Sequence, residues 1–170
     1  MSLFRGRYRI ESARWPAWDY GSPGWYFVTI CAKGPLFGEI FLDGSMWLSE
    51  AEQVMAQEWA QTALIRQRVR LDAWVVMPDH FHGIVGIVDG SGETVGVETP
   101  RRGVSTGWRS GCLGAIVGQF KSVCTKRMGH HGFAWQARYH DRVIRSEREL
   151  ANVRRYIAEN PERWLDRQRT

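Results

Sequence analysis

The chain has 170 residues, of which 44% are hydrophobic, as expected for one globular domain with a substantial core. It has no apolar run of about 18 residues and no signal-peptide core at its N-terminus, so we expect no membrane span and a cytoplasmic location. Three widely spaced cysteines without a Cys-x-x-Cys pair argue against a disulfide framework and against a cysteine-rich zinc site.

The net charge of +5 is unevenly distributed along the chain. Residues 1–100 carry 8 Lys+Arg against 12 Asp+Glu, whereas residues 101–170 carry 15 against 6. Thirteen of those fifteen cations are arginines, whose planar guanidinium suits phosphate. A basic half is typical of proteins that bind a polyanion, most often nucleic acid; a solvated basic surface is the alternative.

In chain order, residues 1–23 interleave arginines with aromatic residues and predict a basic N-terminal arm that contacts nucleic acid, or else a poorly ordered terminus. Residues 25–32 predict a strand, and residues 37–41 and 46–48 predict a hairpin around Asp43-Gly44. Ser49 and Glu52 form a capping box for a helix that is predicted to end near Gln67.

Two further strands are predicted over residues 70–77 and 81–88. The Gly-, Ser- and Arg-rich segment 89–111 predicts a flexible surface loop within a single domain of residues 1–170. A helix over 112–128 and a strand over 135–144 follow. Ser146 and Glu149 open a last helix, which is predicted to stop at Asn160 because Pro161 follows.

Two histidines lie between two apolar runs, residues 71–77 and 84–88. Side chains alternate along a strand, so His80 and His82 point to one face and Phe81 to the other. Two imidazoles on one face can converge on a cation, but a zinc-type site needs at least a third protein ligand. Two partly buried histidines without a function are the alternative.

The last helix carries a tyrosine and an amide four residues apart. Tyr156 and Asn160 therefore lie one turn apart, on the flank of the stripe formed by Leu150, Val153 and Ile157. A tyrosine at such an edge is commonly amphipathic packing, and an asparagine near a helix end is unremarkable.

Taken together, these segments resemble the HUH single-strand endonucleases and, within them, the REP-associated tyrosine transposases. His80-Phe81-His82 matches the histidine–hydrophobe–histidine signature, set in the run Trp74-Val75-Val76-Met77-Pro78-Asp79. Tyr156-Ile157-Ala158-Glu159-Asn160-Pro161 matches the family helix in which a nucleophilic tyrosine precedes an amide by four residues. Trp135-Gln136 and Val143-Ile144-Arg145 resemble the preceding segment, and the likeness covers residues 25–164.

The resemblance implies a ferredoxin-like α/β (α+β) fold, an antiparallel sheet with the two histidines on a central strand and helices packed on one face. His80 and His82 would hold Mg²⁺ or Mn²⁺, with Asn160 as third ligand. Tyr156 would attack single-stranded DNA beside a hairpin and form a 5′-phosphotyrosine, with His80 and His82 as its catalytic partners. Members of this superfamily act as monomers or homodimers, so both states stay open.

The basic half also offers candidates for contacts with the DNA backbone, namely Lys121, Lys126, Arg127, Arg138, Arg101 and Arg102. Two other functions stay open. One is a non-catalytic nucleic-acid-binding regulator with the same fold. The other is a metal-dependent phosphoesterase that uses water as its nucleophile.

Overall fold

The computed structural model describes residues 18–33, 50–89, 111–128 and 133–168, with side chains as far as Asp166. It also describes the backbone of four short strands: β1 (Leu3–Phe4), β2 (Arg7–Tyr8), β4 (Gly38–Ile40) and β5 (Met46–Leu48). β4 pairs with β5 in antiparallel register, which confirms the predicted hairpin. No helix in the described part of the chain is long and apolar enough to span a membrane.

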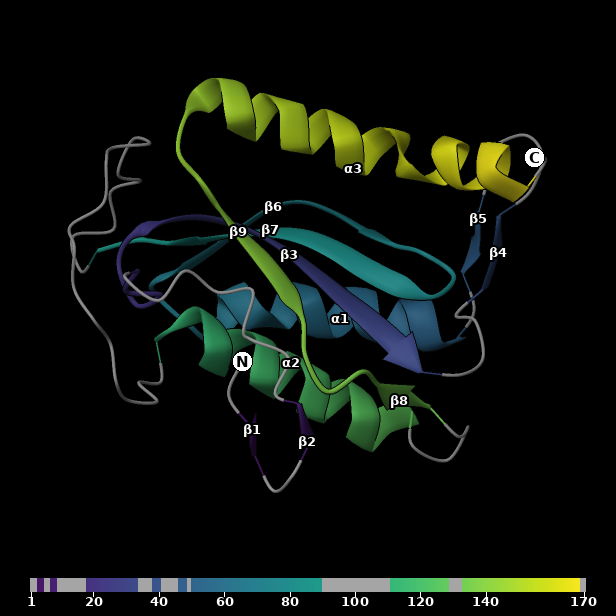
Figure 1. Cartoon of the computed structure of the whole chain (residues 1–170), viewed down its shortest axis with the longest axis horizontal. Helices are drawn as coiled ribbons and strands as arrows, with labels where there is room; N and C mark the ends of the chain where they lie inside the picture. Colours follow the sequence, from purple (N-terminus) through teal and green to yellow (C-terminus); the bar gives the residue numbers. More distant parts are fainter. Residues whose placement is uncertain are drawn as a thin grey trace.

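An antiparallel sheet of five strands forms the centre of the molecule (Figure 1). The strand order is β6-β7-β3, and β8 and β9 both pair with β3 on its other side. The strands are β3 (Gly24–Lys33), β6 (Val69–Val76), β7 (His80–Ile87), β8 (Ala134–Trp135) and β9 (His140–Ile144). The histidine-bearing strand β7 is central, as predicted.

Two helices complete the chain order strand–helix–strand–strand–helix–strand. Helix α1 (Glu50–Leu64) lies between β3 and β6 in the chain, after the β4–β5 hairpin, and helix α2 (Leu113–Met128) follows β7. This order of elements, together with the antiparallel pairing, defines the predicted ferredoxin-like fold.

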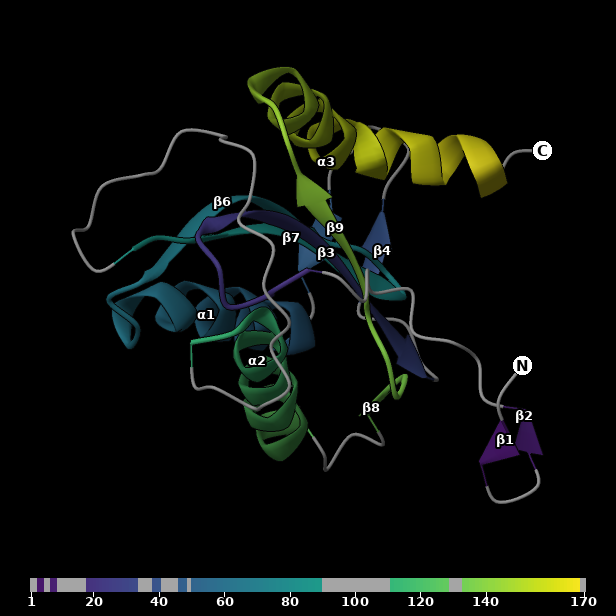
Figure 2. The same cartoon turned by 60° about the vertical axis from the view of Figure 1, so that its left-hand side comes forward.

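The side chains of β3 alternate between two cores. Tyr26, Val28 and Ile30 are fully buried in the larger cluster, together with residues of α1 and α2. Trp25 and Phe27 point to the opposite face, where a smaller cluster packs under α3 (Glu147–Gln168). Figure 2 shows α3 alone on this side of the sheet, with α1 and α2 on the other.

The expectation that the helices pack on one face is therefore wrong for α3. Its apolar stripe of Leu150, Val153 and Ile157 packs on Ile84 of β7 and Ile144 of β9. Both faces of the sheet carry apolar side chains, so both must be covered to remove that surface from water.

Helix α3 also runs past Pro161 to Gln168, whereas the sequence predicts an end at Asn160. Proline lacks the N–H that would bond the carbonyl of Ile157, but it does not end the helix here. An ion pair between Arg163 and Glu159 links the turns on either side of the proline, at 2.7 Å. Trp164 continues the helix over the sheet, with its ring centroid 5.9 Å from that of His80.

Two other boundaries in the structure differ from those predicted from the sequence. The strand predicted over residues 135–144 is divided into β8 and β9, which pair with different parts of β3. Trp18, placed by sequence in the N-terminal arm, is buried in the larger core and donates its indole N–H to the Tyr26 hydroxyl at 3.3 Å. The side chains of residues 1–17 and most of the predicted loop, residues 90–110, lie outside the described residues.

Candidate active site and metal centre

The two histidines lie on the face of β7 that α3 covers. They pair across the sheet with β3, with Cys31 opposite His80 and Thr29 opposite His82. His82 is 4% exposed, and the side chain of His80 is 14% exposed. The pair is therefore shielded by protein while His80 keeps some access to solvent.

Each imidazole is oriented through its Nδ1 atom. The carboxylate of Asp79 is bonded to Nδ1 of His80, and the hydroxyl of Thr29 lies 2.9 Å from Nδ1 of His82. When Asp79 accepts the Nδ1 hydrogen, the lone pair of neutral His80 is on Nε2. The two Nε2 atoms face each other at 3.0 Å.

Tyr156 reaches the same place from α3. Its phenol oxygen lies 3.4 Å from Nε2 of His82, and its ring makes an edge contact with Phe27 at 6.0 Å between centroids. The guanidinium of Arg163 lies over the ring, 5.9 Å from its centroid. Tyr156 is 37% exposed, so its side chain contacts His82 while part of it is accessible to solvent.

Asn160 lies midway along α3 between the two residues that contact the histidines. It is one turn from Tyr156, which contacts His82, and one turn from Trp164, which contacts His80. Asn160 is 1% exposed, and neither polar atom of its side chain has a hydrogen-bond partner among the described residues. A buried amide without a partner is costly, so this side chain suits an additional ligand.

These residues fit a hard divalent cation. A separation of 3.0 Å matches neighbouring ligands of an octahedral ion that binds each at about 2.1 Å. Ligating histidines commonly donate their other ring N–H to a carboxylate, as His80 can to Asp79. The described part of the chain holds no cluster of three His, Cys, Asp or Glu residues. The amide oxygen of Asn160, which has no hydrogen-bond partner among the described residues, is of a ligand type that Mg²⁺ and Mn²⁺ accept.

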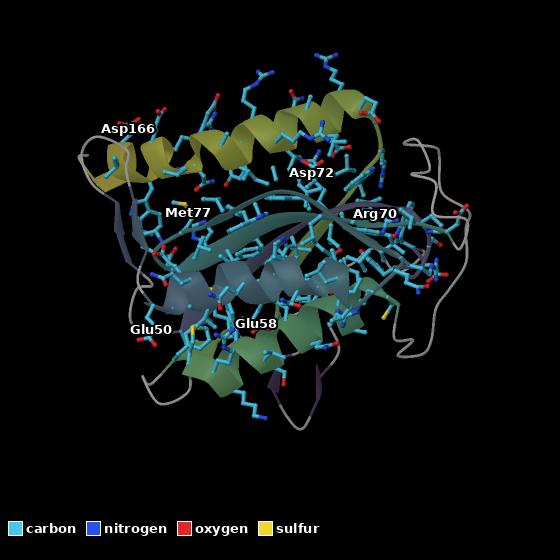
Figure 3. All side chains as sticks on the ribbon, turned by 180° about the vertical axis from the view of Figure 1, so that it is seen from behind. Glu50, Glu58, Arg70, Asp72, Met77 and Asp166 are labelled. Atoms are coloured by element: carbon cyan, nitrogen blue, oxygen red, sulfur yellow. The ribbon has the colours of Figure 1, made fainter. Side chains whose placement is uncertain are left out.

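An ion pair anchors α3 to the sheet close to Tyr156. Arg154 donates through Nε and Nη2 to the two carboxylate oxygens of Asp72 on β6, at 2.8 and 2.6 Å. Figure 3 shows Asp72 on the side of β6 that faces α3. The hydrogen bonds from Arg154 hold the pKa of Asp72 below its usual value. Arg154 is two residues before Tyr156 on α3. The ion pair therefore helps to fix the position of Tyr156 relative to the sheet.

The predicted DNA-binding residues on α2 do not lie around Tyr156. Lys121, Lys126 and Arg127 lie on α2, across the sheet from α3 (Figure 1). Lys121 donates to the carbonyl of Gln136 at 2.7 Å, and burial lowers its pKa. The guanidinium of Arg127 binds Glu58 and Gln57 of α1.

Arg138 lies exposed between β8 and β9, and Arg101 and Arg102 lie outside the described residues. DNA contacts by all six cations stay a prediction.

Three residues at the site escaped sequence reasoning. Asp79 could have been found, because a carboxylate directly before a candidate ligand is a common orienting partner. Thr29 contacts His82 only through the register between β3 and β7. Trp164 was missed because the helix was predicted to end before it.

Comparison with solved structures defines the class of fold. The chain matches the structure of a REP-associated tyrosine transposase bound to a REP hairpin with a TM-score of 0.56 and 20% identity. The match covers 96% of this chain and 74% of that chain. The fold is therefore that of a REP-associated tyrosine transposase, as the sequence resemblance implied.

Comparison of sequences places the chain in a family. It is 31% identical over 171 residues to an uncharacterised protein of Haemophilus influenzae, covering 94% of this chain and 92% of that protein. The chain belongs to the family of this Haemophilus influenzae protein. No family model matches it.

Proposed function

We propose that this protein is a metal-dependent single-strand DNA endonuclease and strand transferase of the transposase type, with Tyr156 as its nucleophile. One observation carries the proposal. The Tyr156 phenol oxygen lies 3.4 Å from Nε2 of His82, which faces Nε2 of His80 at 3.0 Å. The proposed nucleophile and the two proposed cation ligands thus lie together in one chain, although 74 residues separate Tyr156 from His82.

Each residue has a definite role in the proposed reaction. His80, His82 and Asn160 would hold the divalent cation, which would supply positive charge to neutralise a phosphate oxygen. Tyr156 attacks the phosphorus and forms a bond to it, and the bond from phosphorus to the 3′ oxygen breaks. The phenolic proton passes to water on the exposed side of Tyr156, and the 3′ oxygen leaves as a hydroxyl after taking up a proton.

The product of this step is a 5′-phosphotyrosine and a free 3′-hydroxyl. Because one phosphoester replaces another, the covalent protein–DNA link conserves the energy of the broken bond. A 3′-hydroxyl can then attack the phosphotyrosine and rejoin a strand without ATP. This exchange supports strand transfer rather than simple hydrolysis.

Two observations support a DNA hairpin as the substrate. The structure with the matching fold is of a transposase bound to a REP hairpin. The half of this chain that carries α3 has 15 Lys+Arg against 6 Asp+Glu, which favours a polyanion.

The proposal is tested with an end-labelled imperfect DNA hairpin that has single-stranded flanks, incubated with Mn²⁺ or Mg²⁺. We expect a protein–DNA complex that survives denaturing electrophoresis. It should be lost in Tyr156→Phe and on chelation of the metal, while hairpin binding by Tyr156→Phe persists. Tyr20→Phe is a matched control, because Tyr20 packs against Tyr26 on the opposite side of the sheet from the site.

Two results would contradict the proposal in different ways. Metal-dependent cleavage that survives Tyr156→Phe would identify a phosphoesterase that uses water. Hairpin binding without any adduct in the parent protein would identify a non-catalytic binding protein.

A further inference from the structure

A pocket of about 590 Å³ lies beside Tyr156, where β9 leaves the sheet and α3 begins. Phe27 of β3 and Arg142 of β9 line it from the sheet. Arg148 and Asn152 line it from the first turns of α3, and Tyr156 lies at the end nearest the histidines. The volume is in the range of clefts that bind small organic ligands, and a nucleotide is of that size.

The pocket and the metal ligands lie on opposite sides of Tyr156 along α3. The pocket extends from Tyr156 back toward Arg148, which is eight residues or about 12 Å along the helix axis. Asn160 and Trp164 continue in the other direction, over the histidines. The pocket therefore adjoins Tyr156 on the side away from Asn160 and Trp164.

The pocket presents two guanidinium groups, of Arg142 and Arg148, and one carboxylate, of Glu149. Arg142 is bonded through Nε to Oε1 of Glu149 at 2.7 Å, and Oε2 of Glu149 accepts the backbone N–H of Arg145 at 2.9 Å. Both carboxylate oxygens of Glu149 are thus engaged, which holds the Arg142 guanidinium at the pocket. Arg148 is exposed and has no ion-pair partner within the described part of the chain.

We infer that this pocket binds the single-stranded nucleotide that adjoins the scissile phosphate. Arg148 and Arg142 contact its backbone phosphate, and Asn152 and Phe27 provide an amide and an aromatic ring for the base. The inference rests on the proposed function, because the nucleophilic role of Tyr156 is what makes the pocket a neighbour of the reacting phosphate.

The experiment measures binding without chemistry, with the metal chelated. Fluorescein-labelled imperfect DNA hairpins, with and without a single-stranded flank, are titrated with the full chain at several NaCl concentrations. We expect Arg148→Ala to bind the flanked hairpin about tenfold more weakly than the parent does. The slope of log K against log salt should fall by roughly 0.7, the value for one lost phosphate contact on a single strand. Binding of the hairpin without a flank should be unchanged.

Arg155→Ala is the matched control, because it removes the same charge from an exposed position on α3 that does not line the pocket. Equal losses in both variants, or equal losses with and without the flank, would overturn the inference, since a general electrostatic attraction would then explain them.

The adduct assay separates the two proposals. If the parent forms an adduct but Arg148→Ala shows no flank-dependent loss of hairpin binding, only the assignment of the pocket is overturned. The absence of an adduct in the parent overturns the proposed function and the assignment with it.

Discussion

His80 is held between a carboxylate and a second imidazole. Asp79 binds its Nδ1 atom, and Nε2 faces His82 at 3.0 Å. A carboxylate in this place fixes the tautomer of the ring and raises its basicity as a ligand. The local chain encodes this arrangement, because Asp79 directly precedes the strand that begins at His80.

Asp79→Asn should weaken Mn²⁺ binding by about 10- to 100-fold, the usual effect of losing such an orienting partner. The amide can still occupy the position of the carboxylate but carries no charge to stabilise the ligating ring. Isothermal titration calorimetry of the full chain with Mn²⁺ measures the change. Glu159→Gln removes a carboxylate from α3 that pairs with Arg163 and should leave the affinity unchanged. An unaltered Mn²⁺ affinity in Asp79→Asn would show that the carboxylate does not orient a ligand.

At the scale of elements, α3 packs on a small apolar cluster. Its apolar cluster contains five buried residues, far fewer than the cluster on the other face of the sheet. The Arg154–Asp72 ion pair adds a polar contact to this interface. A register shift in β6 between Leu71 and Trp74 places Asp72 and Ala73 together opposite β7, and both face α3.

Asp72→Asn should lower the free energy of unfolding by about 0.5–1 kcal/mol at neutral pH, since the pair is bidentate but Arg154 is half exposed. The hydrogen bonds from Arg154 lower the folded-state pKa of Asp72 below the ordinary 3.8. Its stabilising effect is therefore complete above that pH and is lost as the pH falls through the lower folded-state pKa. Thermal melts of parent and variant should differ at pH 7 and converge in acid.

The control for this prediction is the exposed pair on the same helix. Glu159→Gln should change the melting temperature less, because the Arg163–Glu159 pair does not join α3 to the sheet. A difference between parent and Asp72→Asn that persists unchanged into acid would mean that the charge of Asp72 does not anchor α3.

At the scale of the whole molecule, one chain brings the candidate site residues His80, His82 and Tyr156 together. The antiparallel topology puts β7 beside β3, and the connection through β9 returns the chain across the sheet so that α3 lies over both (Figure 1). Tyr156 and His82 therefore meet in cis, at 3.4 Å.

A mixture of two inactive variants tests this arrangement. His82→Ala retains the nucleophile and Tyr156→Phe retains the metal ligands, so neither should form a covalent DNA adduct alone. We expect their mixture to remain inactive, because each chain lacks part of its own site. Adduct formation in the mixture, measured by denaturing electrophoresis, would show that Tyr156 acts on a site of a second chain.

Much of the site could be predicted from local sequence. Alternation along a strand places His80 and His82 on one face, and helical spacing places Tyr156 and Asn160 on one flank. The cap of the last helix was also predicted correctly: Ser146 accepts the N–H of Glu149 at 3.1 Å. The predicted cap at Ser49 lies outside the described residues. The helix end predicted before Pro161 was wrong. The local preference for an end was outweighed by contacts made by the following turns of α3, including that of Trp164 with His80.

From the sequence by itself, periodicity and capping motifs determined most of the elements, and the resemblance to the HUH endonucleases implied the ferredoxin-like order and the residues that meet at the site. Only the tertiary structure decided that α3 covers the second face of the sheet and that Thr29 supports His82. It alone placed the cations of α2 away from Tyr156 and a pocket with two arginines beside it. These features arise from strand register and from the packing of distant segments, which no local stretch of sequence encodes.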